Sequence, residues 1–305
     1  MENSRFNHHL RMTPCLLSRS LHLQLNHHRH HVRIWGDDDW PRLFMLHGWM
    51  DHSSTFQLLA EAFTRRYQII APDWRGFGGS GWNSGSYYSP DYLADLDALL
   101  AHFSPRQPVH LIGHSMGGMI ASLYAGIRPE RVASLVSIEG FGMPDSQPAD
   151  APERYARWLE QKRSGMSFGP LTSLDMLAAR MQRRQPHLTP ERALWLAGQW
   201  TTTDPHGGLQ YRADPRHKMV NPVLYRLEEA KACWRRIACP VLWVIGGAPE
   251  HSVSAQAVFN TLDERRSCFA RLSEVTIDNA GHMVQQEQPE ALAKAIEDFL
   301  SGIIA

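Results

Sequence analysis

The pentapeptide Gly113-His114-Ser115-Met116-Gly117 combines residue types at a spacing that suits nucleophilic chemistry. A serine between two glycines fits a sharp strand-to-helix turn, because glycines leave out the side chains that would collide there. Such a turn exposes the Ser115 hydroxyl and directs the Met116 N–H toward a developing oxyanion. We therefore interpret Ser115 as a candidate nucleophile.

A serine hydroxyl is a weak nucleophile unless a neighbouring base accepts its proton, and histidine suits that role near neutral pH. Of the 17 histidines, His282 is the best candidate because it follows Asn279-Ala280-Gly281, between the last predicted strand and the last predicted helix. Loops at the carboxyl edge of a parallel sheet can reach a serine turn at the same edge.

Two carboxylates compete for the role of orienting His282. Glu139 directly follows the apolar run 132–138, and Glu250 lies in the loop that follows the run 241–245. Either one could fix the tautomer of the histidine, and both keep the chain order serine, acid, histidine. We favour Glu139 and keep Glu250 as the alternative; a purely structural role for Glu139, bracing the next segment, remains open.

The elements that must position these residues follow an alternating pattern. Strand-like runs and helical periodicity alternate up to residue 138, which predicts an α/β fold with a mostly parallel sheet and helices on both faces. The predicted strands are 43–46, 67–71, 109–112, 132–138, 241–245 and 274–277, and the predicted helices of this part include 56–63 and 92–103.

Residues 140–237 break this pattern, since they contain no strong strand signal and read as helices at 154–162, 171–184 and 190–200. We interpret them as a helical cap inserted into a core made of 19–139 and 238–305. Residues 1–18 are expected to be a flexible N-terminal extension.

Composition narrows the class of protein. Thirty-one basic and 31 acidic residues give no net charge, which argues against a nucleic-acid partner. No apolar run approaches the roughly 20 residues that span a membrane, and residues 1–19 contain no apolar core of a signal peptide. The four cysteines have no metal-site spacing, so we expect no cofactor and no metal, and a cytoplasmic location.

A cluster of histidines at positions 27, 28, 30 and 31 lies between two strand-like runs, 21–25 and 31–35. We interpret the cluster as a polar hairpin turn rather than a metal site.

Several motifs together resemble those of the α/β-hydrolase superfamily. His47-Gly48-Trp49-Met50 resembles its oxyanion loop, and the segment 73–80 resembles the loop after the next strand. Residues 113–118 resemble its nucleophile elbow, and Gly281-His282 resembles its histidine loop. The similarity runs from about residue 30 to the C-terminus and extends to the serine hydrolase-like group.

The resemblance implies that Ser115 is the nucleophile, that His282 is the base, and that the N–H groups of Trp49 and Met116 form the oxyanion hole. Each such donor contributes roughly 3 kcal/mol to transition-state stabilisation. Most members carry an aspartate in the loop after the strand that follows the cap, a position that here falls on Pro249, one residue before Glu250. The residues expected beside the substrate are Trp49, His114, Phe141 and Trp158.

The expected function is that of a serine hydrolase, which cleaves a carboxylic ester of a small or medium-sized apolar compound through an acyl-enzyme. The same triad also suits hydrolysis of a carbon–carbon bond, a lactone or an amide. A non-catalytic protein that binds a small ligand is the alternative from another class. Dehalogenase and epoxide hydrolase chemistry is disfavoured, because those enzymes carry aspartate where this chain has Ser115.

Overall fold

The computed structural model describes residues 14–248 and 253–304. Within this part of the chain, eight strands form one sheet in the order β1-β2-β4-β3-β5-β6-β9-β10. The strands are β1 (Ser18–Leu25), β2 (His28–Trp35), β3 (Arg42–Leu46), β4 (Gln68–Pro72), β5 (Val109–His114), β6 (Val132–Ile138), β9 (Val241–Gly246) and β10 (Leu272–Ile277).

The sheet is parallel from β4 to β10, as the alternating pattern predicts. Only its first part is antiparallel: β1 pairs with β2, and β2 pairs with β4. Asn26 and His27, at φ 49° and 61°, form the tight connection between β1 and β2. The predicted hairpin is thus observed, with His27 in its turn, whereas His28, His30 and His31 lie in the strand β2. No group of three or more His, Cys, Asp or Glu side chains among the described residues is placed to hold a metal ion.

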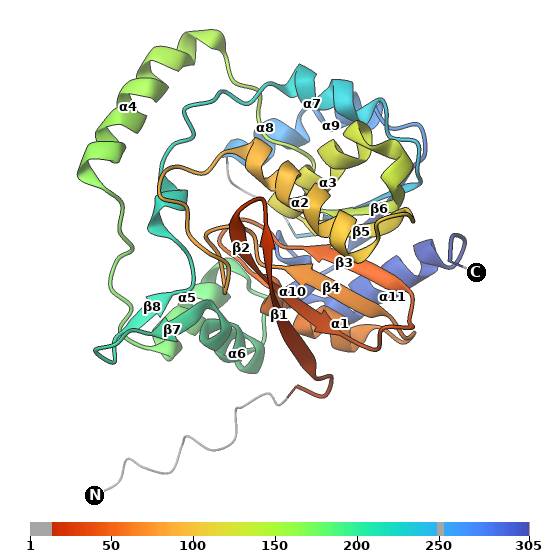
Figure 1. Ribbon diagram of the computed structural model, residues 1–305, viewed down its shortest axis with the longest axis horizontal. Coiled ribbons are helices and arrows are strands. Elements are labelled where there is room, and N and C mark those ends of the chain that lie inside the picture. The colour runs from red at the N-terminus through yellow and green to blue at the C-terminus, as the bar shows by residue number, and fades with distance from the viewer. Residues whose placement is uncertain (1–13, 249–252, 305) are drawn as a thin grey trace, which may run out of the picture.

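Helices cover both faces of the sheet (Figure 1). Alternate side chains of a strand point to opposite faces, so Phe44 and Leu46 of β3 join one buried cluster while Leu43 and Met45 join another. The helices of the core are α1 (Gln57–Ala62), α2 (Ser89–Phe103), α3 (Met116–Ile127), α7 (Leu227–Trp234), α8 (Val253–Phe259), α9 (Leu262–Arg266), α10 (Val284–Glu287) and α11 (Pro289–Leu300), with the short 3₁₀ turns η1 (Ser53–Phe56) and η2 (Pro129–Arg131).

The insertion after β6 lies beside the sheet, at the left of Figure 1. It consists of η3 (Pro148–Asp150), α4 (Ala151–Ser164), α5 (Leu174–Arg184), α6 (Pro190–Trp200), a hairpin of β7 (Thr201–Thr203) and β8 (Leu209–Tyr211), and η4 (Pro215–Lys218). Helix α4 has no buried residue, whereas α5 and α6 share a hydrophobic cluster with Leu58 of α1. The lobe of α5 and α6 is thus fixed to the core.

Helix α7 lies within the predicted cap range, 140–237, but it packs against α3. Its Leu227, Ala230 and Trp234 belong to the main core cluster, because their spacing gives the helix one apolar face. The part of the insertion that lies outside the core therefore ends before Leu227, and within it Phe141 and Ala213 also join the main core cluster.

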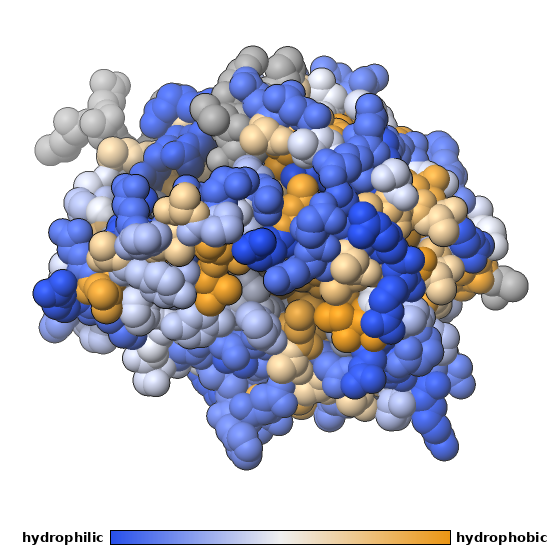
Figure 2. Space-filling model, turned by 90° about the horizontal axis from the view of Figure 1, so that it is seen from above, coloured by the Kyte–Doolittle hydropathy of each residue, from blue (hydrophilic) through white to orange (hydrophobic). Residues whose placement is uncertain are grey.

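The surface is mixed in character. Figure 2 shows, from above, small hydrophobic patches separated by hydrophilic side chains. None of the helices in the described part of the chain is both long enough and apolar enough to cross a lipid bilayer.

Candidate active site

Ser115 lies on a strained turn between β5 and α3. Its φ of 50° and ψ of −117° are rare for a residue with a side chain. The turn is held by the Ser115 N–H, which donates to Ile138 O of β6 at 2.8 Å, and by the Ser115 carbonyl, which accepts from Met119 N at 2.9 Å. Strain of this kind persists only where the surroundings enforce it, and it is concentrated at functional sites.

Gly117 allows the elbow to lie against the neighbouring strand. A Cβ at this position would be 2.1 Å from the carbonyl oxygen of Leu46, which no side chain can tolerate. The N–H of Met116 belongs to the first turn of α3, where backbone donors have no acceptor within the helix. The helix start therefore presents a donor next to the Ser115 side chain.

His282 lies near one of the two candidate carboxylates. Its Nδ1 is 3.4 Å from Oε2 of Glu139, whose side chain is 8% exposed against 43% for His282. Oε1 of Glu139 accepts the N–H of Gly246 at 2.8 Å, and the Glu139 N–H donates to Val244 O at 3.0 Å. The carboxylate is thus fixed between the ends of β6 and β9. Hydrogen bonds between catalytic groups are often this long before a substrate binds.

His114 lies beneath the loop that carries His282. Its Nε2 is 2.8 Å from the carbonyl oxygen of His282, and since a carbonyl only accepts, Nε2 carries the proton. Burial, together with the nearby His282, holds the pKa of His114 well below its usual value, so its ring is neutral. His114 supports the backbone of His282.

The oxyanion-loop motif lies directly over the elbow. A Cβ at Gly48 would be 2.7 Å from Nδ1 of His114 and 3.2 Å from Cβ of Ser115, so only glycine allows this approach. The residue Trp49 is 53% exposed. Met50 has a φ of 60°, which directs the chain sharply away after Trp49.

His47 and Asp73 brace the loops around the site. Nε2 of His47 accepts the Trp74 N–H, and the Trp74 indole donates to the His47 carbonyl, both at 2.9 Å. The buried Asp73 carboxylate accepts from the N–H groups of Ser53 and Gly79 and is 2.7 Å from Nδ1 of His31. Burial alone would raise the pKa of Asp73, but the hydrogen bond with His31 and the nearby rings of His52 and His47 hold it below its usual value.

Two residues expected beside the substrate are covered in this structure. Phe141 is buried against Trp243, with ring centroids 4.9 Å apart, and His114 is also buried. Their low exposure gives no support to a direct contact with substrate, which stays a prediction for both residues. Trp158 lies on α4, where its indole donates to Ser86 Oγ at 3.2 Å. Glu250 lies outside the described residues.

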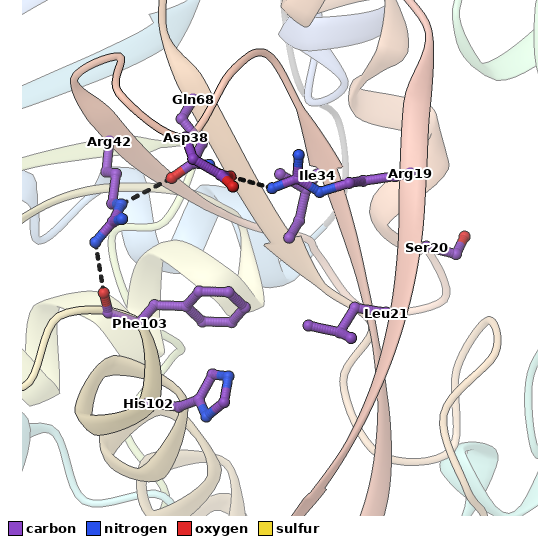
Figure 3. A pocket seen from close by; sticks show the side chains of 9 residues that line it. All are labelled: Arg19, Ser20, Leu21, Ile34, Asp38, Arg42, Gln68, His102 and Phe103. Atoms are coloured by element: carbon purple, nitrogen blue, oxygen red, sulfur yellow. Dashed lines mark hydrogen bonds and ion pairs between the residues drawn. The ribbon is translucent and has the colours of Figure 1, made fainter.

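A serine, a histidine and an aspartate also lie within hydrogen-bonding distance of one another outside the Ser115 site. Ser20 Oγ is 2.9 Å from Nε2 of His31, whose Nδ1 faces Asp73. Ser20 is in the regular strand β1, without the strained turn and helix start found at Ser115. Nine residues that include Ser20 line a pocket of about 370 Å³, but the Ser20 side chain points away from the others (Figure 3).

That pocket lies far from Ser115 along the strands. Arg42 and Gln68, which line it, are the first residues of β3 and β4, whereas Ser115 follows the last residue of β5. The pocket is therefore at the amino edge of the parallel sheet and the elbow is at the carboxyl edge, where ligands of open α/β sheets bind. Its Arg42 is already bonded to Gln68 and to the Phe103 carbonyl.

Sequence analysis did not single out two residues that directly follow Gly48-Trp49-Met50. Asp51 and His52 are buried, and both bond to the end of α6 in the insertion. Their partners, Trp200 and Gln199, are nearly 150 positions away, so no local pattern announces the contact. A polar pair directly after the His-Gly-Trp-Met motif is the signal that could have drawn attention to them.

The fold and the strand, turn and helix at Ser115 define an α/β hydrolase, and the chain belongs to the alpha/beta hydrolase fold family, whose model matches residues 41–289. A serine hydrolase-like protein of Danio rerio is 21% identical over 284 residues, which cover 88% of this chain and 84% of the relative.

A pimeloyl-[acyl-carrier protein] methyl ester esterase of Aeromonas hydrophila is 27% identical over 269 residues, covering 85% of this chain and 95% of that esterase. The thioesterase domain from the curacin biosynthetic pathway has a similar structure, with a TM-score of 0.79 at 22% identity over 92% of this chain and 99% of that domain. Family and relatives together identify the chain as a hydrolase.

Proposed function

We propose that the protein is a serine hydrolase that cleaves a carboxylic ester of a small or medium-sized apolar compound through an acyl-enzyme. The observation that carries the proposal is the convergence at one sheet edge of a strained Ser115, of His282, and of Glu139 at 3.4 Å from its Nδ1. An ester is favoured over other bonds because a relative that aligns over most of its length is a methyl ester esterase.

In the proposed reaction, Oγ of Ser115 attacks the ester carbonyl while Nε2 of His282 takes its proton. Glu139 holds the Nδ1–H tautomer and stabilises the imidazolium that forms. The N–H groups of Trp49 and Met116 stabilise the oxyanion. The alcohol leaves with the proton from His282, and a water activated by the same histidine then releases the acid and restores Ser115.

The substrate would approach from the side of Trp49, whose half-exposed indole adjoins the oxyanion loop. An indole offers a broad apolar surface, which suits the acyl or alcohol part of an apolar ester. The proposed reaction does not depend on a substrate contact at Phe141 or His114, since both are buried.

The test is turnover of short-chain p-nitrophenyl esters together with labelling by a fluorophosphonate probe. We expect wild type to hydrolyse at least one ester and to be labelled at Ser115, and S115A to do neither. Ser20→Ala is the matched control, because Ser20 also lies in a serine, histidine and aspartate chain, and this variant should retain both properties. Absence of turnover and labelling in wild type would refute the proposal and favour a protein that only binds its ligand.

A further inference from the structure

The segment that would supply one half of the oxyanion hole is bonded to the cap. Asp51 and His52 follow the loop of Gly48, Trp49 and Met50, and both are buried. Oδ1 of Asp51 accepts the indole N–H of Trp200 at 2.9 Å. Trp200 is the last residue of α6, so this hydrogen bond joins the loop to the insertion.

A second hydrogen bond runs parallel to the first. Nε2 of His52 is 2.8 Å from the carbonyl oxygen of Gln199 and therefore donates to it, while Nδ1 faces Ser54 Oγ at 3.0 Å. The last carbonyls of a helix have no partner within the helix. His52 donates to one of these carbonyls, so the end of α6 and the loop are joined by a second hydrogen bond.

The loop needs such support because its backbone is strained. Met50 has a φ of 60°, which a side chain disfavours. On the amino side of Trp49, Gly48 lies against the elbow residues His114 and Ser115. On its carboxyl side, the carboxylate of Asp51 accepts from Trp200 on Oδ1 and from the hydroxyl of Thr55 on Oδ2, the latter at 3.0 Å. Contacts on both sides of Trp49 therefore restrain the direction of its N–H.

We infer that Trp200 is a positioning residue for the oxyanion hole, acting through Asp51, so that the α5 and α6 lobe of the cap pre-organises the catalytic loop. This inference rests on the proposed serine hydrolase function. It extends that function to a residue that touches neither the reacting atoms nor the substrate.

The variant that tests it is Trp200→Phe, which keeps an aromatic ring but loses the indole N–H together with the five-membered part of the indole; Trp195→Phe loses the same atoms. A misdirected oxyanion donor weakens the transition state more than the bound substrate, so we expect kcat to fall about tenfold with KM unchanged within about twofold. Affinity for a boronic acid, which forms a tetrahedral adduct on Ser115, should fall by the same factor. Trp195→Phe, a partly buried tryptophan on the same helix, is the matched control and should retain wild-type kcat.

A double-mutant cycle tests whether the loss of kcat in W200F acts through Asp51. Asp51→Ala should lower kcat at least as far as W200F does, and the double variant should be no worse than D51A alone, since the same hydrogen bond is lost. Full additivity, an unchanged kcat in W200F, or an equal loss in W195F would overturn the inference.

Failure of the proposed function is recognised separately. If wild type neither turns over esters nor reacts with the fluorophosphonate, amide hydrogen exchange over residues 48–52 still tests the coupling. Faster exchange in W200F than in wild type and W195F supports it, and equal exchange rates overturn it.

Discussion

Oε2 of Glu139 lies 3.4 Å from Nδ1 of His282. Glu139 itself has a φ of 52°, and its other carboxylate oxygen accepts the Gly246 N–H. A left-handed backbone at the end of β6 therefore turns the side chain across the sheet edge toward β9 and the histidine loop. This geometry favours Glu139 as the acid of the proposed triad.

Glu139→Gln should lower kcat by about 10³- to 10⁴-fold, because a neutral amide neither stabilises the imidazolium nor enforces the right tautomer of His282. KM should change little, since the side chain is buried away from the substrate. The measurement is steady-state hydrolysis of the best p-nitrophenyl ester found for wild type.

Glu250→Gln provides the matched comparison, because it changes the alternative carboxylate in the same way. We expect it to retain kcat within about threefold. The reverse pattern, with E250Q inactive and E139Q active, would assign the acid to the loop after β9.

The sequence was sufficient to predict the elements around the elbow. Period-two and continuous apolar runs locate the strands, and the helix 190–200 is observed with the predicted bounds. Ser115 and His282 could be singled out as candidates because glycines and strand ends mark their positions locally. Both candidate carboxylates also followed strands, so their order along the chain left the choice between them open.

Contacts between distant segments could not be predicted. The bond between Asp51 and Trp200 joins residues 149 positions apart and depends on how the insertion folds back. The hairpin of β7 and β8 was missed because each strand has three residues, too few for a periodic signal. The apolar spacing of Leu227, Ala230 and Trp234 was a usable signal that α7 belongs to the core.

Gly117→Ala should prevent the turn at Ser115 from adopting its observed backbone conformation. The added Cβ would meet the carbonyl oxygen of Leu46 at 2.1 Å, and a backbone atom of a central strand cannot move away cheaply. We expect a loss of about 3 kcal/mol in the free energy of unfolding, measured by urea denaturation, together with loss of fluorophosphonate labelling.

Gly198→Ala is the control for this substitution. Gly198 lies inside α6, and a Cβ there meets nothing within 4 Å. The helix should gain about 0.5–1 kcal/mol from the lower entropy of the unfolded chain. Equal stability of the two variants would show that the approach of the elbow to β3 is not as tight as the structure indicates.

Asp73→Asn should destabilise the protein without touching the reacting groups. The amide cannot accept all the donors that converge on the carboxylate from Ser53, Gly79 and His31, so about 3 kcal/mol is expected to be lost at pH 7. Asp39→Asn, at an exposed position, should stay within about 0.5 kcal/mol of wild type.

The loss of stability at low pH gives an independent check of the role of the ionised Asp73. The folded-state pKa of Asp73 is lowered, so its contribution is present above the unfolded-state value of about 3.9 and is lost as pH falls further. Urea denaturation from pH 5 to pH 2.5 should therefore show a shallower decline in D73N than in wild type. Parallel curves would contradict the ionised role of Asp73.

His217 of the insertion packs against residues of the core, and we expect the contribution of this contact to the free energy of unfolding to depend on pH. Its ring stacks between Phe77 and Tyr87, at centroid distances of 3.8 and 3.7 Å, and its Nε2 is 3.2 Å from the Arg75 carbonyl. Burial lowers the pKa of His217 to about 3. The folded protein thus keeps the ring neutral at pH values where the unfolded chain binds a proton.

This difference between the folded-state and unfolded-state pKa of His217 sets the direction in which stability changes with pH. The stabilisation is complete above the unfolded-state pKa of about 6.5 and is lost as pH falls from there toward 3, by about 1.4 kcal/mol per pH unit for one proton. His217→Phe keeps the stack but does not titrate, so its free energy of unfolding should fall less steeply than that of wild type between pH 7 and pH 5. Tyr87→Phe, which removes only a hydroxyl from the same stack, should lower stability by the same amount at both pH values. A wild-type slope retained in H217F would show that His217 takes up its proton in the folded state.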